Sequence, residues 1–377
     1  MKLTDVVDRI NGNVDRFTTE LEYYIGGEHF ESNELEVTQK GLLKENLGKL
    51  GFKFHFAFQD RDVVFMARNP HLRKAGMVRF AGLCSDASYI LRSKDETVLS
   101  QEYLAVMLQS DHFWDYCESH KVGSVNFANN WSSIANYEFE LPTPEEQKEI
   151  SDKVWAAYRL KKSYKKLLAA TEEMVKSQFI EMFGNPLSQV QRYPLEKLGD
   201  CCVLNPRRPS ISLSDTDMVS FVPMPCVSEN GYLQDVADEE YGKVKKGFTY
   251  FENKDVLFAK ITPCMENGKG AIAQELTNGI GMGSTEFHVL RPIEGKSNSY
   301  WLLALTRMPI FREQASKNMS GTGGQKRVGA SFLDNFMVGL PPIEEQNRFE
   351  RIYRQADKSG SVGLKSGLNF AKLLIHR

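Results

Sequence analysis

The heptapeptide LPTPEEQ at residues 141–147 returns as LPPIEEQ at residues 340–346, at an offset of 199 residues. In each copy an alternating apolar stretch stops at proline, and acidic residues follow directly after it. Proline and carboxylates suit the first turn of a helix, because proline has no N–H to leave unpaired and the helix dipole favours negative charge there. The repeated heptapeptide therefore predicts, at two places in the chain, a strand that ends and a helix that begins.

Two further blocks repeat in the same order. FQDRDVVF at residues 58–65 matches FENKDVLF at residues 251–258, at an offset of 193. SDASYILR at residues 85–92 matches STEFHVLR at residues 284–291, again at an offset of 199. Three blocks in one order at nearly constant offset are hard to obtain by chance, so the sequence predicts a duplicated unit.

Each copy is predicted to be a mixed α/β unit of the α+β type. Apolar runs and apolar residues at helical spacing predict paired strands (63–67 and 256–261, 89–91 and 287–290), paired helices (101–118 and 299–316) and paired late strands (137–141 and 336–340). Long loops rich in glycine and asparagine connect these elements. Loops on a rigid scaffold are where recognition residues usually lie, so we look for them there.

A long amphipathic helix is predicted to start at Pro144. From there to Phe183 the chain has no further proline and no glycine, and Gly184-Asn185-Pro186 ends the helix. Its apolar residues recur at spacings of three and four: Ile150, Val154, Ala157, Leu160, Tyr164, Leu167, Leu168, Met174, Val175, Phe179 and Met182. At about 1.5 Å per residue such a helix spans roughly 58 Å, which predicts a spacer.

A second helix is predicted to begin at residue 342, with Phe349, Tyr353 and Ala356 at helical spacing. Further along, Gly360, Gly363 and Gly367 each cost about 1 kcal/mol in a helix interior, so we expect this helix to be shorter or broken. Antiparallel packing against the first helix lets both bury their apolar stripes. The alternative is that both are ordinary core helices of one compact protein.

The charge distribution leaves nucleic-acid binding open. The net charge of −2 argues mildly against it, because neutralising phosphates normally needs a positive surface. Residues 53–94, however, hold eight basic and three acidic side chains, which is compatible with one basic face on an otherwise acidic protein. The alternative is a set of solvated loops without a partner.

Several classes of site are not predicted. The six cysteines form no C-x-x-C pair, so neither a metal site nor a disulfide framework is expected. Residues 69–71 and 205–207 lack the second proline of an Asn-Pro-Pro-Phe methyltransfer motif, and no nuclease carboxylate cluster stands out. We therefore expect no catalytic residue. We also expect a cytoplasmic protein, since residues 1–11 do not read as a leader and no apolar run approaches about 20 residues.

The pattern as a whole resembles the specificity subunits of type I restriction and modification enzymes. The duplicated unit carries this resemblance together with the motifs LPPIEEQ at 340–346, FIEMFGNP at 179–186, YIGGEH at 24–29 and ITPCMENGK at 261–269. It extends over essentially the whole chain. The P-x-E-E-Q helix start is the most specific motif, and its double occurrence is stronger than either copy.

The resemblance implies two target recognition domains, residues 1–143 and 185–341, in a pseudo-twofold arrangement. Two long antiparallel helices, residues 144–184 and 342–377, would join them. Each domain would read one half of a bipartite DNA sequence, and the helices would bind two copies of an adenine-specific DNA methyltransferase. The chain itself would hold no cofactor, whereas S-adenosylmethionine would bind to the methyltransferase, and ATP and Mg²⁺ to a nuclease and translocase subunit.

Candidate DNA contacts lie in two loops of each copy, because Arg, Lys, Asn, Gln and short hydroxyl side chains read base edges and bind phosphates. Before the late strands they are Thr322, Gln325, Lys326 and Arg327, with Lys121, Ser124, Asn126 and Asn129 in the first copy. After the buried strands they are Lys260, Asn267 and Lys269, with Arg68, Asn69, His71, Arg73 and Lys74 in the first copy. Ser284, Thr285 and Glu286 open a strand, where they either cap the chain or contact DNA.

Lys161, Lys162, Lys165 and Lys166 form a charged stripe on the long helix. Such a stripe is either a solvated face or a surface that meets acidic residues of a methyltransferase. His288, within a strand, is interpreted as a packed residue. Two rival functions stay open: a stand-alone enzyme that binds nucleotides through residues 321–327, and a scaffold whose duplicated domains bind peptides.

Overall fold

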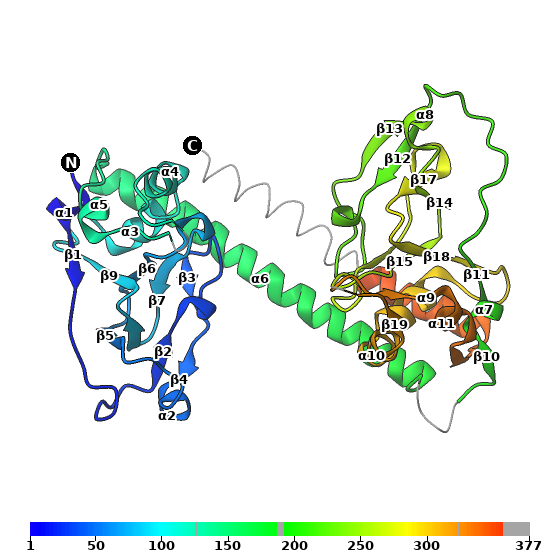
Figure 1. Ribbon diagram of the computed structural model, residues 1–377, viewed down its shortest axis with the longest axis horizontal. Helices are drawn as coiled ribbons and strands as arrows, with labels where there is room; N and C mark the ends of the chain where they lie inside the picture. Colours follow the sequence, from blue (N-terminus) through cyan, green and yellow to red (C-terminus); the bar gives the residue numbers. More distant parts are fainter. Residues whose placement is uncertain (125–126, 187–191, 323, 357–377) are drawn as a thin grey trace. The chain divides into compact units, whose positions relative to one another are not determined.

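The computed structural model describes residues 1–124, 127–186, 192–322 and 324–356, and it divides into two compact units (Figure 1). Unit 1 holds residues 1–165, and unit 2 begins at Lys166. The predicted division had its boundaries at the two ends of the long helix. In the structure that helix is shared, because its first part packs in the core of unit 1 and its last part in the core of unit 2.

Two sheets form the frame of unit 1. The first has the order β1-β9-β6-β7-β3, from β1 (Val7–Ile10), β9 (Ser88–Ser93), β6 (Val63–Met66), β7 (Ala75–Val78) and β3 (Glu36–Val37). The second has the order β4-β2-β8-β5, from β4 (Gly41–Leu42), β2 (Tyr23–Ile25), β8 (Gly82–Ser85) and β5 (Phe54–Phe58). Every residue of β6 is buried, as expected for the central apolar run.

Short helices cover the sheets of unit 1: α1 (Leu3–Val6), η1 (Gly27–His29), α2 (Leu43–Asn46), η2 (Pro70–Leu72), α3 (Gln101–Met107), α4 (Asp111–Ser119) and α5 (Trp131–Ala135). The helix predicted over 101–118 is therefore two helices. The break follows from Ser110, whose hydroxyl accepts a hydrogen bond from the Phe113 N–H and so caps a new helix start.

Unit 2 repeats the second sheet and the first four strands of the first sheet, without a described counterpart of β3. Its first sheet has the order β11-β18-β15-β16, from β11 (Cys202–Leu204), β18 (Phe287–Pro292), β15 (Val256–Ala259) and β16 (Gly270–Ile272). Its second has the order β13-β12-β17-β14, from β13 (Ala237–Glu240), β12 (Met218–Val222), β17 (Ile280–Gly283) and β14 (Thr249–Glu252). β12 runs parallel to β17 as β2 runs parallel to β8. The predicted mixed fold and the duplication are confirmed.

The helices of unit 2 are α7 (Leu198–Cys201), η3 (Met224–Cys226), α8 (Tyr241–Val244), η4 (Thr277–Gly279), α9 (Ser299–Arg307), α10 (Pro309–Lys317) and α11 (Ala330–Asn335). All but η4 follow the order of the helices of unit 1, since η4 precedes β17 whereas η2 follows β6. Two short ladders add β10 (Leu195–Lys197) with β21 (Met337–Gly339) and β19 (Met319–Ser320) with β20 (Arg327–Val328). The predicted helix over 299–316 divides at Met308, because Pro309 suits the first position of a new helix.

The same buried ion pair locks the central strands of each unit. Asp62 accepts two hydrogen bonds from Arg92, at 2.8 and 2.9 Å, and Asp255 accepts two from Arg291, both at 2.8 Å. Each carboxylate also accepts a backbone N–H from three residues earlier, and each aspartate is only 1% exposed. The duplication therefore reaches the level of single contacts.

The glutamine of the repeated heptapeptide fastens the helix start to its own unit. The Gln147 amide donates to the carbonyls of Val98 and Pro142, at 2.8 and 2.9 Å, and accepts from the Ser100 N–H. Gln346 does the same with Lys296, Pro341 and Asn298. Both glutamines are buried, and these bonds satisfy their amides.

The long helix α6 runs from Pro144 to Phe183, over the range that the sequence predicts. Thr143 and Glu146 form a capping box at its start, since each side chain accepts the other's backbone N–H. The predicted apolar stripe is only partly buried, because Leu160, Leu167 and Met174 are 43 to 47% exposed. Neither α6 nor any other described helix has an apolar stretch that could cross a bilayer.

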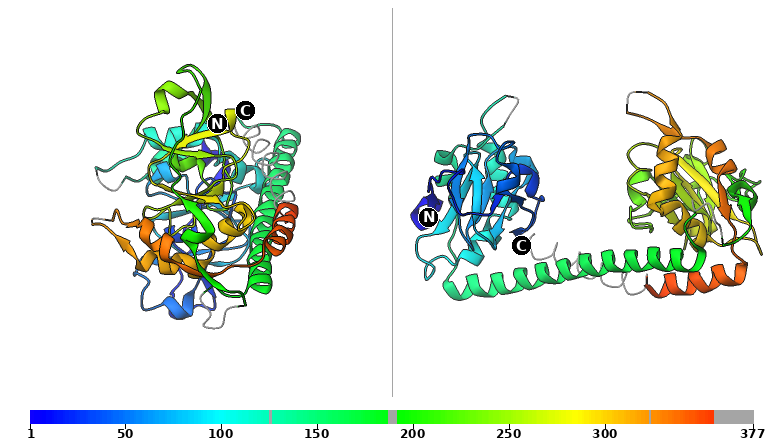
Figure 2. Two further views of the ribbon diagram at one scale, coloured as in Figure 1. Left: turned by 90° about the vertical axis from the view of Figure 1, so that its right-hand side faces the viewer. Right: turned by 90° about the horizontal axis from the view of Figure 1, so that it is seen from below.

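Residues 343–356 form a helix that packs beside the last part of α6 within unit 2 (Figure 2). The Phe349 ring lies 5.6 Å from Phe179 and 5.4 Å from Phe183, between ring centroids. The Tyr193 hydroxyl donates to Glu345 at 2.6 Å and lies 3.2 Å from the Met182 carbonyl oxygen, so the start of one helix lies at the end of the other. The two helices are antiparallel there. The glycines at 360, 363 and 367 lie outside the described residues.

Candidate nucleic-acid interface

The loop predicted to contact DNA in unit 2 joins the two strands of the β19–β20 hairpin. Thr322, Gln325 and Lys326 in this loop are all exposed. Gly321 has φ +127°, and a Cβ there would lie 2.6 Å from the Gln325 carbonyl oxygen, so the loop requires glycine. The loop leads into a strand rather than a helix, and it therefore lacks the helix N-terminus on which many phosphate sites are built.

The second predicted loop of unit 2 lies against the hairpin. Ile261 and Arg327 form a β-bridge, and the Thr262 N–H donates to the Lys326 carbonyl at 3.0 Å. Lys260 and Lys269 are half-buried, whereas Asn267 is exposed and donates to Glu229 at 2.9 Å. The structure thus brings the two loops that the sequence singled out into one surface.

Arg327, the last of the predicted hairpin contacts, is already paired. Its Nη2 donates to the Glu286 carboxylate at 2.8 Å and its Nε at 3.0 Å. The Arg327 hydrogen bond holds the pKa of Glu286 below its ordinary value, although burial acts in the opposite direction. The guanidinium of this arginine therefore has a carboxylate along its Nε–Nη2 side.

Unit 1 has the same two loops in the same relation. Arg68 and Val122 each form a β-bridge with Ala128, which joins the loop after β6 to the loop before α5. Arg68, His71 and Ser124 are exposed and available to a ligand. Asn126, also a predicted contact, lies outside the described residues.

Asn129 was predicted to contact DNA, and that prediction is wrong. Its side chain is 1% exposed, and the amide donates to the Cys117 carbonyl at 2.7 Å. The side chain thus points into unit 1 and holds the loop in place. Asn69 also shapes the backbone: it adopts a left-handed conformation with φ 54°, and its N–H donates to the Phe127 carbonyl.

Three predicted cations of unit 1 have partners inside the unit. Arg73 is paired with Asp111, Lys121 with Glu118 at 2.6 Å, and Lys74 donates to the Gly27 carbonyl at 2.6 Å. Such contacts leave them fewer donors for phosphates than a solvated cation would have. Their role as DNA contacts stays a prediction, weaker than that of Arg68.

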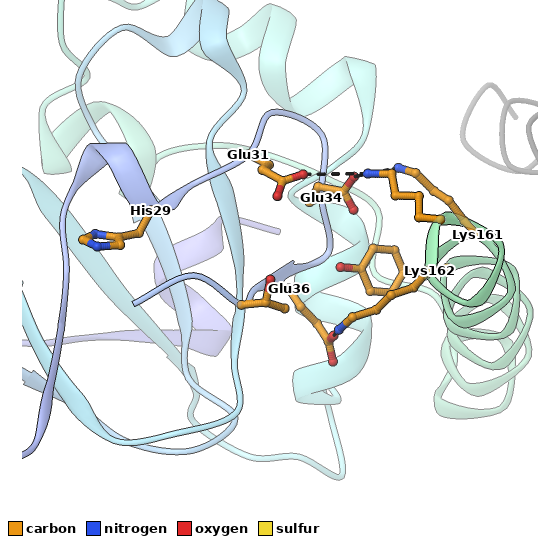
Figure 3. A pocket seen from close by; sticks show the side chains of 9 residues that line it. His29, Glu31, Glu34, Glu36, Lys161 and Lys162 are labelled. Atoms are coloured by element: carbon orange, nitrogen blue, oxygen red, sulfur yellow. Dashed lines mark hydrogen bonds and ion pairs between the residues drawn. The ribbon is translucent and has the colours of Figure 1, made fainter. Parts of the chain in front are cut away.

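The lysine stripe of α6 meets acidic residues of unit 1 itself. Lys161 and Lys165 contact Glu34 at 2.9 and 3.0 Å, and Lys162 contacts Glu36 at 2.8 Å (Figure 3). These three lysines thus have acidic partners within unit 1, and their contact with a methyltransferase stays a prediction. Lys166, which belongs to unit 2, is exposed and remains a candidate for such a contact.

A small cavity of about 90 Å³ lies between these charges, lined by His29, Thr38 and Tyr158 as well as the lysines and glutamates. Burial raises the pKa of Glu34, while hydrogen bonds from Lys161 and Lys165 lower it, and the balance lies below the ordinary value. Glu34 is therefore ionised at neutral pH. The sequence gave no signal for this pairing, because Glu34 precedes its partners by more than 120 residues.

Two further residues support the hairpins and were not predicted to do so. The Tyr89 hydroxyl donates to the Asn129 carbonyl at 2.8 Å, and His288 Nε2 lies 2.9 Å from the Val328 carbonyl. They occupy the same position of the repeated blocks SDASYILR and STEFHVLR. His288 is 6% exposed, and burial lowers its pKa, so the interpretation of His288 as a packed residue is confirmed.

Metal-binding groups do not gather in the part of the chain that the structure describes. Across residues 1–124, 127–186, 192–322 and 324–356, no three His, Cys, Asp or Glu side chains lie close enough together to hold a metal ion. Five of the six cysteines are buried free thiols, and Cys264 is half-buried. The chemistry offered by the two loop surfaces is hydrogen bonding and positive charge.

Comparison with known proteins identifies the second half of the chain. Residues 197–361 match the family model of the type I restriction modification DNA specificity domain. The specificity subunit of the type I restriction enzyme EcoEI from Escherichia coli is 39% identical over 155 residues, which cover 40% of this chain and 25% of that protein. The EcoAI specificity subunit, also from Escherichia coli, is 42% identical over 142 residues, 37% of this chain and 24% of that protein. The chain thus matches about a quarter of the length of these relatives.

A solved structure extends the likeness in fold to the whole chain. The crystal structure of the type I restriction-modification system S subunit from M. genitalium has a TM-score of 0.60 and 11% sequence identity, over 100% of this chain and 94% of that one. At this identity the match concerns the fold. The chain therefore carries a type I restriction modification DNA specificity domain over residues 197–361, and its resemblance to the specificity subunits of these systems is confirmed.

Proposed function

We propose that this chain is the sequence-specific DNA-binding subunit of a type I restriction-modification complex and reads a bipartite target. The observation that carries the proposal is the duplication: unit 1 repeats the sheets and the buried contacts of unit 2, the unit that matches the DNA specificity domain. Two similar readers in one chain suit a target with two half-sites.

Each unit would read its half-site with the surface made by its two adjacent loops. In unit 2, Gln325 offers an amide that suits adenine in the major groove, and Lys326 offers a cation for guanine or phosphate. In unit 1, Arg68, His71 and Ser124 occupy the corresponding surface. Because the two sets of side chains differ, we expect the two half-sites to differ in sequence.

We further propose that the chain is not an enzyme and that partner subunits supply the chemistry. Two copies of an adenine-specific DNA methyltransferase would use S-adenosylmethionine, and a restriction and translocase subunit would use ATP and Mg²⁺. One observation supports this: the relatives are named as specificity subunits of restriction enzymes. The host chromosome, and thus the cytoplasm, is the expected site of action.

The test is a genome-wide map of methylated adenines in the host with and without the gene. A bipartite motif with a fixed gap should be methylated in the wild type and should disappear in the deletion strain. An identical map in both strains would contradict the proposal. Purified chain and methyltransferase that together protect no DNA sequence would instead favour a peptide-binding scaffold.

A further inference from the structure

Glu286 and Arg327 form a side-on ion pair at the centre of the loop surface in unit 2. The carboxylate accepts hydrogen bonds from Nε at 3.1 and 3.0 Å and from Nη2 at 2.8 Å. Nη1 donates to the Gln325 carbonyl at 3.1 Å. Of the five N–H donors of an arginine, three are thus engaged, and one on each terminal nitrogen has no partner among the described residues.

The pair is specific to unit 2. The Lys260 N–H donates to the Glu286 carbonyl, as the Ala67 N–H donates to that of Ala87. Arg327 forms a β-bridge with the loop after β15, as Ala128 does with the loop after β6. Unit 1 therefore has alanine at both positions, so the acid and the base are present together or absent together. Because unit 1 has the same fold without this acid and base, the fold does not require them. The pattern therefore indicates that Glu286 and Arg327 act together in a function other than stabilising the fold.

The surroundings fix the guanidinium without burying it. The side chains of Arg327 and Glu286 are 40% and 25% exposed, so the pair lies at the surface. Lys260 and His288 lie close enough to influence the Glu286 carboxylate, and the His288 ring contacts the Val328 carbonyl beside Arg327. The arginine is thereby held on two sides, by Glu286 and by its own loop backbone.

We propose that Glu286 is a positioning residue that holds the Arg327 guanidinium for end-on recognition of one guanine in the half-site read by unit 2. The two remaining N–H groups match the O6 and N7 acceptors that guanine presents in the major groove. This inference rests on the proposed function, and it assigns a base class to one position of the target.

The carboxylate also explains how such an arginine avoids indiscriminate binding. A free guanidinium binds any phosphate bidentately, and phosphates outnumber the target guanine along any duplex. Glu286 occupies the Nε–Nη2 side of the guanidinium, one of the two sides on which a phosphate could bind bidentately, and its negative charge repels phosphate from the other side. The two N–H groups that remain, one on Nη1 and one on Nη2, can then both form hydrogen bonds with the edge of a base.

The experiment uses the full-length chain assembled with its methyltransferase, on duplexes that carry the methylated motif. Each guanine of the motif is replaced in turn by 7-deazaguanine, which keeps the base pair but lacks the N7 acceptor. For the wild type, one guanine in one half-site should weaken binding on the order of tenfold. In Glu286→Gln that sensitivity should be lost, while the slope of log K against log salt steepens by up to about 0.9, one additional phosphate contact.

Two further variants make the result decisive. Arg327→Lys keeps the charge and the contact with Glu286 but lacks the fork, so it should lose sensitivity at the same guanine even if Glu286→Gln folds poorly. Glu313→Gln removes a carboxylate from an exposed helical ion pair with Lys317 in the same unit and should behave as wild type. The guanines of the other half-site should respond alike in all four proteins.

The outcomes separate the inference from the function on which it rests. If the wild-type complex binds no sequence selectively, the proposed function fails. If it binds a bipartite motif but no guanine depends on Arg327, the assignment of guanine is overturned. If Glu286→Gln merely melts earlier, with base sensitivity and salt slope unchanged, Glu286 stabilises the hairpin and does not position the arginine.

Discussion

At the scale of single residues, Asp62 and Asp255 show how much one side chain contributes to each unit. Each aspartate lies within the core, bonded to an arginine and to the turn three residues before it. Loss of the carboxylate would leave the turn without its acceptor and the arginine without its buried partner, although Arg291 would keep Glu252 at 3.2 Å. Such one-sided removal costs more than the ion pair itself is worth.

Replacement of Asp255 by Ala is therefore expected to destabilise unit 2 by roughly 2 to 3 kcal/mol, a figure reduced for the partial exposure of Arg291. Calorimetry should show one transition at lower temperature and the other unchanged. Asp62→Ala is the matched variant and should shift the other transition. If either variant shifted both transitions, the two ion pairs, Asp62–Arg92 and Asp255–Arg291, would not stabilise the two units independently.

Replacement of Gln325, Lys326 and Arg327 by Ala should abolish recognition of one half-site, while the methyltransferase still assembles with the chain. The reason is that Gln325 and Lys326 are exposed in the hairpin loop and Arg327 begins β20 directly after it, whereas none of the three belongs to α6 or to the helix of residues 343–356. Footprinting on the full motif checks recognition, and size-exclusion chromatography checks assembly. Unchanged methylation at both half-sites would reject the assignment.

The solvent exposure of a side chain could be predicted from the sequence where the residue lies in a polar, glycine-rich loop. It could not be predicted where the exposure depends on how distant residues pack. The exposed Gln325 and Lys326 follow from a polar, glycine-rich stretch between strands. Asn129 looks just as polar in sequence, but it is buried because the Cys117 carbonyl, twelve residues away, needs a donor. Glu286 was already among the residues predicted either to cap the chain or to contact DNA, and its pairing with Arg327 could have been suspected from its repeat partner, Ala87.

At the scale of elements, α6 packs on unit 1 through its lysines, which contact the acidic residues at and just before β3. Trp155 and Tyr158 supply the apolar contact, and Lys161 and Lys165 surround Glu34 at the edge. Helix ends and central strands were predictable because proline, glycine and apolar periodicity mark them locally. The partners of the lysine stripe were not, because charge alone does not tell which distant segment meets it.

The docking of α6 should weaken in acid. The folded-state pKa of Glu34 lies below its ordinary value of 4.5, because the hydrogen bonds from the two lysines outweigh burial, which acts in the opposite direction. The contribution of Glu34 is therefore present above about pH 4.5 and is lost as the pH falls through the lowered pKa. Glu34→Gln should melt below wild type at pH 7, and the difference should shrink toward pH 3 in thermal scans. A constant difference over that range would count against this assignment.

At the scale of the whole molecule, the prediction that follows from the proposed function concerns the gap between the half-sites. Deletion of residues 166–169, which lie beyond the lysines docked on unit 1, shortens α6 by about 6 Å. If α6 sets the separation of the readers, the permitted gap should change by about two base pairs, at roughly 3.4 Å per base pair. Mapping methylated motifs in cells with the deletion checks this. An unaltered gap would mean that α6 does not act as the spacer.

The repeated aspartate–arginine ion pair has a further consequence while the chain is synthesised on the ribosome. Because both units use the same aspartate–arginine pair, Asp62 could pair with Arg291 of unit 2 instead of Arg92. The two units of one chain therefore risk exchanging the strands that carry these residues. Asp255 leaves the ribosome 163 residues after Arg92, and at about 5 to 20 residues per second this delay amounts to roughly 8 to 30 seconds. Small domains of mixed topology fold within about a second or less. The order of translation thus lets unit 1 fold before the equivalent strands of unit 2 leave the ribosome.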